Sequence, residues 1–137
     1  MSKLFNISEA SNIAVHSLAL IAGSKEPMNA TRIADVLQLS RNHIAKVLQV
    51  LSRHGIITSR RGPKGGFNLL VNPDQLSMYE IYEIMDGKIE PEQCRREDGV
   101  CPFEECVFGD ARQRLFREFK SYYSGRTLGD LKLSLKS

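Results

Sequence analysis

The chain has 137 residues, of which 42% are hydrophobic and 26% charged, and its formal net charge is +3 at pH 7. A chain of this length can bury roughly two thirds of its unfolded surface in one core, and this composition is ordinary for a globular domain. No apolar run approaches the ~20 residues that span a bilayer, and the first residues lack the apolar segment of a signal peptide, so we expect a cytoplasmic protein without a membrane partner.

The first predicted element is a helix over residues 8–22, followed by a break at residues 23–27. Small and apolar residues recur on one face at intervals of three and four, namely Ala10, Ile13, Ala14, Ser17, Leu18 and Ile21. Glu9, Asn12 and His16 share the opposite face. These three side chains are placed either to meet a partner or simply to face solvent.

A helix-turn-helix is predicted next. Asn29 or Thr31 is expected to cap a short helix that ends at Leu37, and residues 38–39 form a tight turn. Ser40 then caps a second helix. Its buried face consists of Ile44, Val47, Leu48 and Leu51, and its opposite face of Arg41, Asn42, His43, Lys46, Gln49 and Arg53.

A β-hairpin follows this helix. Gly55 supplies the left-handed position that ends the helix, one strand begins directly after it, and a second strand returns at residues 67–70. The hairpin loop holds Arg60, Arg61 and Lys64 beside several glycines. A helix-turn-helix followed by a basic hairpin indicates a winged helix.

Basic charge is concentrated in this region. Between Val36 and Pro73 there are six Arg or Lys residues and no Asp or Glu, which leaves the remainder of the chain with a net charge of −3. Such a stretch is typical of a nucleic-acid face, while the plain alternative is a solvated helix beside a flexible turn. We expect double-stranded DNA as the partner, with the second helix in the major groove and the hairpin on the backbone and minor groove. The predicted DNA-binding residues are Ser40, Arg41, Asn42, His43, Lys46, Arg60, Arg61 and Lys64.

The C-terminal part of the chain begins with a capping-box pattern, Ser77 and Glu80, at the start of another helix. Residues 111–123 form a further helix whose aromatic stripe either packs internally or pairs with its copy in a homodimer. The predicted fold class is mainly α with a small β-hairpin. A winged helix-turn-helix domain occupies residues 1–76, and residues 77–137 supply a linker helix, a cysteine loop and a long C-terminal dimerisation helix.

Three cysteines lie in an acidic segment. Between Asp86 and Asp110 there are eight acidic and three basic residues, together with Cys94, Cys101 and Cys106. An odd number of cysteines in a reducing compartment argues against a disulfide framework and favours metal or redox chemistry. Three thiolates leave one position of a tetrahedral metal site or of an iron-sulfur cluster to another ligand. A structural zinc site and three thiols with no special role are the alternatives.

The sequence resembles the IscR/NsrR-like family of bacterial winged-helix regulators over nearly its whole length. The resemblance rests on residues 12–18, 62–67 and 127–131 and on the three-cysteine loop. It implies a homodimer with long crossed dimerisation helices, an iron-sulfur cluster on the cysteines, and control of transcription through loss or change of that cluster. The gaps of six and four residues between the cysteines differ from the equal gaps that members commonly have, so a 2Fe-2S and a 4Fe-4S cluster both stay open.

The resemblance also bears on the fourth ligand. Nitric-oxide-sensing members use an Asp of the partner's first helix, where this chain has Asn12, and the cluster-biogenesis regulators place a His where this chain has Gly109. A redox-responsive subclass uses a carboxylate and a His one turn apart on the first helix, and His16 matches that His. The expected metal ligands are Cys94, Cys101 and Cys106 with His16, which a partner subunit can supply, ahead of Asn12 and Glu9, with Glu104, Glu105 and Asp110 as local alternatives.

The predicted function is that of a homodimeric transcription regulator whose operator affinity is set by an iron-sulfur cluster that senses redox state, nitric oxide or iron-sulfur status. A winged-helix regulator switched by zinc or by thiol oxidation is the alternative. A small iron-sulfur electron carrier would leave the basic helix and hairpin without a purpose. No pair of nucleophile and base in the sequence supports an enzyme.

Overall fold

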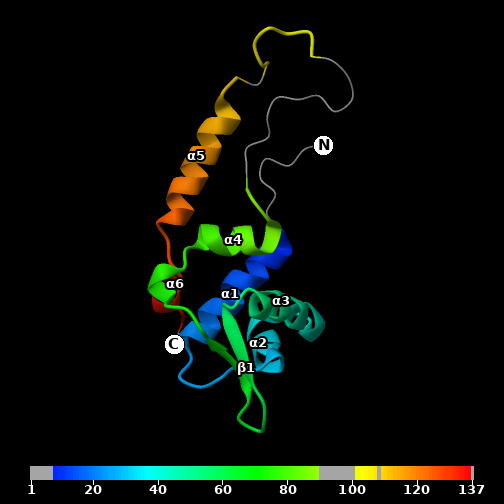
Figure 1. The fold of residues 1–137 in the computed structure, drawn as a ribbon, viewed down its shortest axis with the longest axis vertical. Coiled ribbons are helices and arrows are strands. Elements are labelled where there is room, and N and C mark those ends of the chain that lie inside the picture. The colour runs from blue at the N-terminus through cyan, green and yellow to red at the C-terminus, as the bar shows by residue number, and fades with distance from the viewer. Residues whose placement is uncertain (1–7, 90–100, 108, 137) are drawn as a thin grey trace.

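The computed structural model describes residues 8–89, 101–107 and 109–136 (Figure 1). The elements in chain order are α1 (Glu9–Gly23), α2 (Ala30–Leu37), α3 (Arg41–Arg53), β1 (Ile57–Arg60), β2 (Gly66–Leu69), the short 3-10 helix η1 (Pro73–Gln75), α4 (Met78–Asp86), α5 (Ala111–Ser124) and α6 (Leu128–Leu133). The predicted class, mainly helical with one small antiparallel hairpin, is confirmed. No helix in the described residues is both long enough and apolar enough to cross a membrane.

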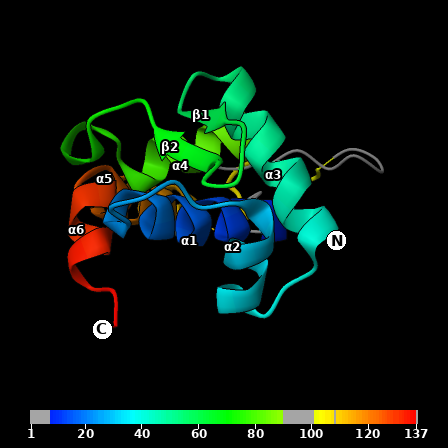
Figure 2. The same ribbon diagram turned by 90° about the horizontal axis from the view of Figure 1, so that it is seen from below.

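Helix α1 lies at the centre of the fold and contacts α2, α3, α4, α6 and β2. In Figure 2 it runs across the middle of the molecule, with the hairpin on one side and α6 beside its C-terminal end. The sequence predicted a single buried face, but Ser11, Val15 and Ala19 are buried as well. A helix with neighbours on several sides buries more than one stripe, which explains the difference.

The helix-turn-helix forms as predicted. Asn29 caps α2 by accepting a hydrogen bond from the backbone N–H of Arg32 at 2.8 Å, and Gln38 takes the left-handed conformation in the turn (φ 57°). Ser40 stands at the position before α3, but its side chain makes no capping hydrogen bond among the described residues. The predicted inward face of α3 is buried, with Ile44, Val47, Leu48 and Leu51 at most 5% exposed.

The hairpin is fastened to the start of the helix-turn-helix. Strands β1 and β2 pair from Ile57 with Leu69 to Arg60 with Gly66. Phe67 and Met28 exchange two backbone hydrogen bonds, of 2.8 and 3.2 Å, so the segment before α2 acts as a partial third strand. A Cβ on Gly66 would lie 2.6 Å from the backbone of Met28, and this close approach requires glycine.

Residues after the hairpin return to α1. Ser77 caps α4 by accepting from the Glu80 backbone N–H at 3.1 Å. The backbone N–H of Met78 donates to the Arg126 carbonyl at 2.8 Å, and that of Leu128 donates to the Leu76 carbonyl at 2.8 Å. These bonds place α6 against α1 and η1. Helices α4 and α6 both share the core with α1. The predicted division of the chain between residues 76 and 77 stays a prediction.

Helix α5 projects from this body (Figure 1) and attaches to α4 through aromatic rings. Phe119 stacks on Tyr82 with ring centroids 6.0 Å apart, and Tyr123 meets the edge of Tyr82 at 5.5 Å. Burial raises the pKa of the Tyr82 phenol, and the electrostatic interaction with Tyr123 raises it to a smaller degree. Leu115 and Tyr122 of the same helix are 50% and 52% exposed. The predicted stripe is thus divided between internal packing and open surface.

Candidate functional site

The outward face of α3 carries the predicted polar and basic side chains. All of its predicted members are exposed, namely Arg41, Asn42, His43, Lys46, Gln49 and Arg53. Arg60, Arg61 and Lys64 of the hairpin are exposed as well. Figure 1 shows the hairpin loop extending beyond the body at the end opposite α5. Both basic elements, α3 and the hairpin, are therefore exposed to solvent. The sequence has no acidic residue between Val36 and Pro73 that would offset their charge.

Arg41 is held by a residue of the preceding helix. Its Nε donates to the hydroxyl of Thr31, in the first turn of α2, at 3.0 Å. The fork of its two terminal nitrogens then extends from a fixed stem, which suits bidentate contact with a phosphate or a guanine. The sequence indicates Thr31 only as a possible helix cap, because no periodic pattern links residues ten positions apart across a turn.

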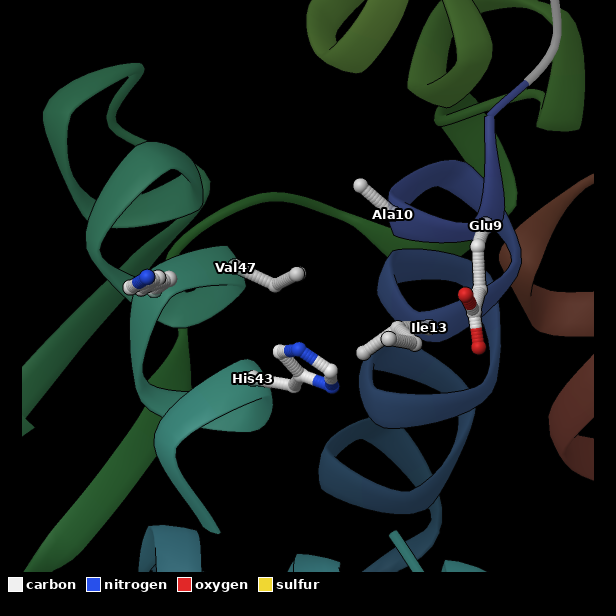
Figure 3. A pocket seen from close by; sticks show the side chains of 6 residues that line it. Glu9, Ala10, Ile13, His43 and Val47 are labelled. Atoms are coloured by element: carbon white, nitrogen blue, oxygen red, sulfur yellow. The ribbon is translucent and has the colours of Figure 1, made fainter. Parts of the chain in front are cut away.

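A cleft of about 220 Å³ separates α3 from the first turns of α1. Its lining consists of Glu9, Ala10 and Ile13 from α1 and His43, Lys46 and Val47 from α3. Figure 3 shows the His43 ring directed across the cleft toward Ile13. Two of the residues predicted to contact DNA thus also face α1, so a movement of the first turn of α1 bears directly on α3.

His16 has a defined hydrogen-bonding arrangement on the exposed face of α1. Its Nδ1 lies 2.6 Å from the backbone carbonyl oxygen of Asn12. A carbonyl oxygen only accepts, so Nδ1 carries the proton and the outward Nε2 keeps its lone pair in the neutral ring. Histidine ligands in metal sites are commonly held in this way, with the second nitrogen donating to a carbonyl. Of the three predicted α1 ligands, His16 is therefore the one whose ring is held by a backbone hydrogen bond.

The loop before α5 carries two of the three cysteines as thiols. Cys101 and Cys106 are both half-buried, and the backbone N–H of Gly109 donates to the Cys106 carbonyl at 2.9 Å. Cys94 lies outside the described residues. Among the residues that are described, no three His, Cys, Asp or Glu side chains gather closely enough to hold a metal ion.

The alternative local ligands point into solvent. Glu104, Glu105 and Asp110 are exposed, and Asp110 Oδ1 pairs with Arg114 Nε at 3.1 Å. In Figure 1 the cysteine loop, residues 101–107, lies beyond the far end of α5, whereas α1 lies within the body. Within one chain, therefore, α1 and the cysteine loop are apart.

Comparison with known proteins decides the family. The sequence model of the Rrf2 family, described as iron-dependent transcriptional regulators, matches residues 7–132. The chain belongs to the Rrf2 family. It is 28% identical to a helix-turn-helix regulator of Aquifex aeolicus over 128 residues, which cover 90% of this chain and 89% of that protein. It is also 23% identical over 105 residues to the regulator IscR of Aliivibrio salmonicida, covering 77% of this chain and 62% of that protein.

A solved Rrf2-like fold agrees with the architecture described above. CymR, the global cysteine regulator of B. subtilis, superposes with a TM-score of 0.81 at 24% sequence identity, and the match covers 99% of this chain and all of CymR. The resemblance predicted from the wing, the first helix and the cysteine loop is confirmed, since relatives of this chain are named IscR and NsrR. As an Rrf2 protein the chain is a transcription regulator, and the relatives that match it include regulators of the helix-turn-helix type.

Proposed function

We propose that this Rrf2 regulator is a homodimer whose affinity for double-stranded DNA is set by an iron-sulfur cluster. The observation that carries the proposal is the pair of half-buried thiols, Cys101 and Cys106, in the loop that leads into α5. Thiolates are the usual ligands of such clusters, and the family is described as iron-dependent. Because the protein would act on DNA, we expect it to work in the cytoplasm.

Three thiolates and one nitrogen form the proposed ligand set. Cys94, Cys101 and Cys106 supply the sulfur atoms, and His16 of a second copy supplies Nε2. Imidazole replaces thiolate in some iron-sulfur centres, and His16 Nδ1 is already occupied by the Asn12 carbonyl. Asn12 ranks lower because a neutral amide is a poor metal ligand. Glu9 ranks lower because it lines the cleft beside α3.

A homodimer is supported by the position of α5. This helix projects from the body, and about half of the surface of Leu115 and of Tyr122 is exposed. Pairing of α5 with its copy would cover these side chains and carry the cysteine loop of one chain toward α1 of the other. The two α3 helices would then meet successive major grooves of a two-fold operator, whose half-sites are spaced by about 34 Å.

Cluster binding would act as a brace in this arrangement. Cys94, Cys101, Cys106 and His16 of the second copy would hold the cluster and so join the acidic cysteine loop to α1, and this connection would be absent without the cluster. A movement of α1 would then reach α3, because the two helices border the same cleft, which is lined by Glu9 and His43 among others. A change in the relative position of the two α3 helices alters how both can bind one operator.

Absorption spectroscopy and intact mass measurement, both without air, test the proposal together. We expect a coloured protein whose mass corresponds to two chains and two clusters. The alternative is a winged-helix regulator switched by zinc or by oxidation of the thiols of Cys101 and Cys106. That regulator would be colourless, and its mass would show bound zinc or the loss of thiol hydrogens.

A further inference from the structure

Asp86, the last residue of α4, caps the first turn of α1 from another part of the chain. Its Oδ2 accepts a hydrogen bond from the backbone N–H of Ser8 at 2.9 Å and a second from the hydroxyl of Ser11. Ser8 is the N-cap of α1, and Ser11 is fully buried. The carboxylate also lies at the positive end of the α1 dipole, where a negative charge is favoured. Asp86 therefore fixes the N-terminal end of α1 to the C-terminal end of α4.

The turn of α1 that Asp86 holds is the one that faces α3. Glu9 and Ala10 lie between Ser8 and Ser11 in sequence and line the cleft opposite His43 and Lys46. The rest of α1 is held by its buried neighbours, whereas this end also depends on the two hydrogen bonds to Asp86. Its position relative to α3 therefore responds to what happens at Asp86.

The cysteines follow Asp86 in the sequence. Gly87 turns the chain out of α4 with a positive φ of 79°. Ile89 is buried, and its carbonyl accepts from the hydroxyl of Tyr79 at 3.2 Å, so the chain is anchored just after the helix ends. Cys94 is the eighth residue after Asp86. Ile89, the last residue described before Cys94, is thus held against α4, and Cys94 itself lies outside the described residues.

We propose that Asp86 is a positioning residue that couples the cysteine segment to helix α3 through the first turn of α1. The inference rests on the proposed function, because it supplies the route by which a change at the cysteines reaches the DNA-binding face. A shift of the end of α4 moves the carboxylate away from Ser8 and Ser11. The first turn of α1 then loosens, and the wall of the cleft that faces His43 moves with it.

Two serines of α1 provide a matched test. Ser11 and Ser17 are both fully buried, but Ser17 Oγ has no hydrogen-bond partner among the described residues. Ser11→Ala removes one bond to Asp86 and no residue of the DNA-binding face, while Ser17→Ala makes the same chemical change without breaking a bond to α4. Both variants and the wild type are titrated, with and without the cluster, on a DNA duplex selected from a random pool by the wild-type protein.

The measured quantity is the ratio of the two DNA affinities, with and without the cluster. Allosteric couplings commonly amount to about 5- to 150-fold, and we expect a wild-type ratio of about tenfold or more that Ser17→Ala retains. Ser11→Ala should reduce it to about twofold or less. A large wild-type ratio that Ser11→Ala leaves intact overturns the coupling alone. A wild-type ratio of one overturns the cluster switch and this inference together.

A second variant and a second measurement separate coupling from simple loss of stability. Asp86→Asn keeps an acceptor oxygen but removes the charge, so its ratio should lie between those of the wild type and Ser11→Ala. Hydrogen exchange of the cluster-free proteins should show the amides of the first turn of α1 exchanging about tenfold faster in Ser11→Ala than in Ser17→Ala. Equal exchange rates in these two variants would contradict the role of the Asp86 bonds.

Discussion

The guanidinium of Arg41 and the hydroxyl of Thr31 join the first turns of the two helices of the helix-turn-helix, with Arg41 Nε and Thr31 Oγ1 3.0 Å apart. Both residues are exposed, so the bond lies at the surface of the protein. An arginine side chain loses much rotational freedom when it binds. A bond that fixes its stem beforehand lowers that cost.

We therefore expect Thr31→Val to weaken binding of the selected DNA duplex by about three- to tenfold, since a hydrogen bond of this kind contributes about 0.5–1.5 kcal/mol. Thr31→Ser keeps the hydroxyl and should bind nearly as the wild type does. Arg41→Ala and Asn42→Ala should relax discrimination between the selected duplex and single-base variants. Titrations that find Thr31→Val and Thr31→Ser equal would show that the bond does not position Arg41 for DNA.

The hairpin should act through charge rather than through base recognition. Arg60, Arg61 and Lys64 are exposed on the wing, and each contact with a DNA phosphate contributes about one unit to the slope of log affinity against log salt. A triple substitution by Gln should flatten that slope by about two to three units and leave the ranking of DNA sequences unchanged. An unaltered slope would remove the wing from the DNA-binding face.

Much of the fold could be predicted from residue spacing. The run from Ile44 to Leu51 has the period of a helix with one buried face, and the structure buries those positions. Thr127 and Asp130 form a capping box at the start of α6, from two residues whose spacing is local in the sequence. Such patterns work because their causes lie within one or two helical turns. The burial of Val15 on a second side of α1 had no such local sign, since it depends on helices that arrive later in the chain.

The candidate site was harder to predict because its contacts join distant residues. Ser11 and Asp86 lie 75 positions apart, and neither belongs to a motif. Arg41 was predicted as a DNA contact, but its support by Thr31 follows from the angle between two helices. The proposed ligands are a third case, since α1 and the cysteine loop are apart in one chain and Cys94 lies outside the described residues.

The attachment of α5 to α4 should weaken in alkali. Because the pKa of Tyr82 in the folded protein is raised above its ordinary value of 10.0, the unfolded chain loses this proton first as the pH rises. The folded state then binds more protons than the unfolded state. The contribution of Tyr82 to the free energy of unfolding is therefore complete below pH 10 and is lost as the pH rises through the raised pKa. Tyr82→Phe should lose less stability than the wild type between pH 9 and pH 11. If thermal unfolding experiments show the same decline for both proteins, ionisation of Tyr82 is not the cause.

His16 should determine how firmly the cluster is held. His16→Ala removes the proposed Nε2 ligand and leaves the three thiols, so we expect a cluster that forms, has an altered absorption spectrum and is lost faster to a chelator. His54 provides the control, because its Nδ1 lies 2.9 Å from the carbonyl of Val50 in the same kind of arrangement at the C-terminal end of α3. If His16→Ala and His54→Ala both keep the wild-type spectrum and rate of loss, His16 is not a ligand.

The proposed function requires that the cluster set the affinity of this Rrf2 regulator for DNA. The most direct measurement is the affinity of the wild-type protein for the selected duplex, with and without the cluster, without air and at one salt concentration. We expect the two affinities to differ by about tenfold or more, and Cys101→Ala and Cys106→Ala to bind as the cluster-free protein does. Equal affinities of the two wild-type forms would contradict the switch.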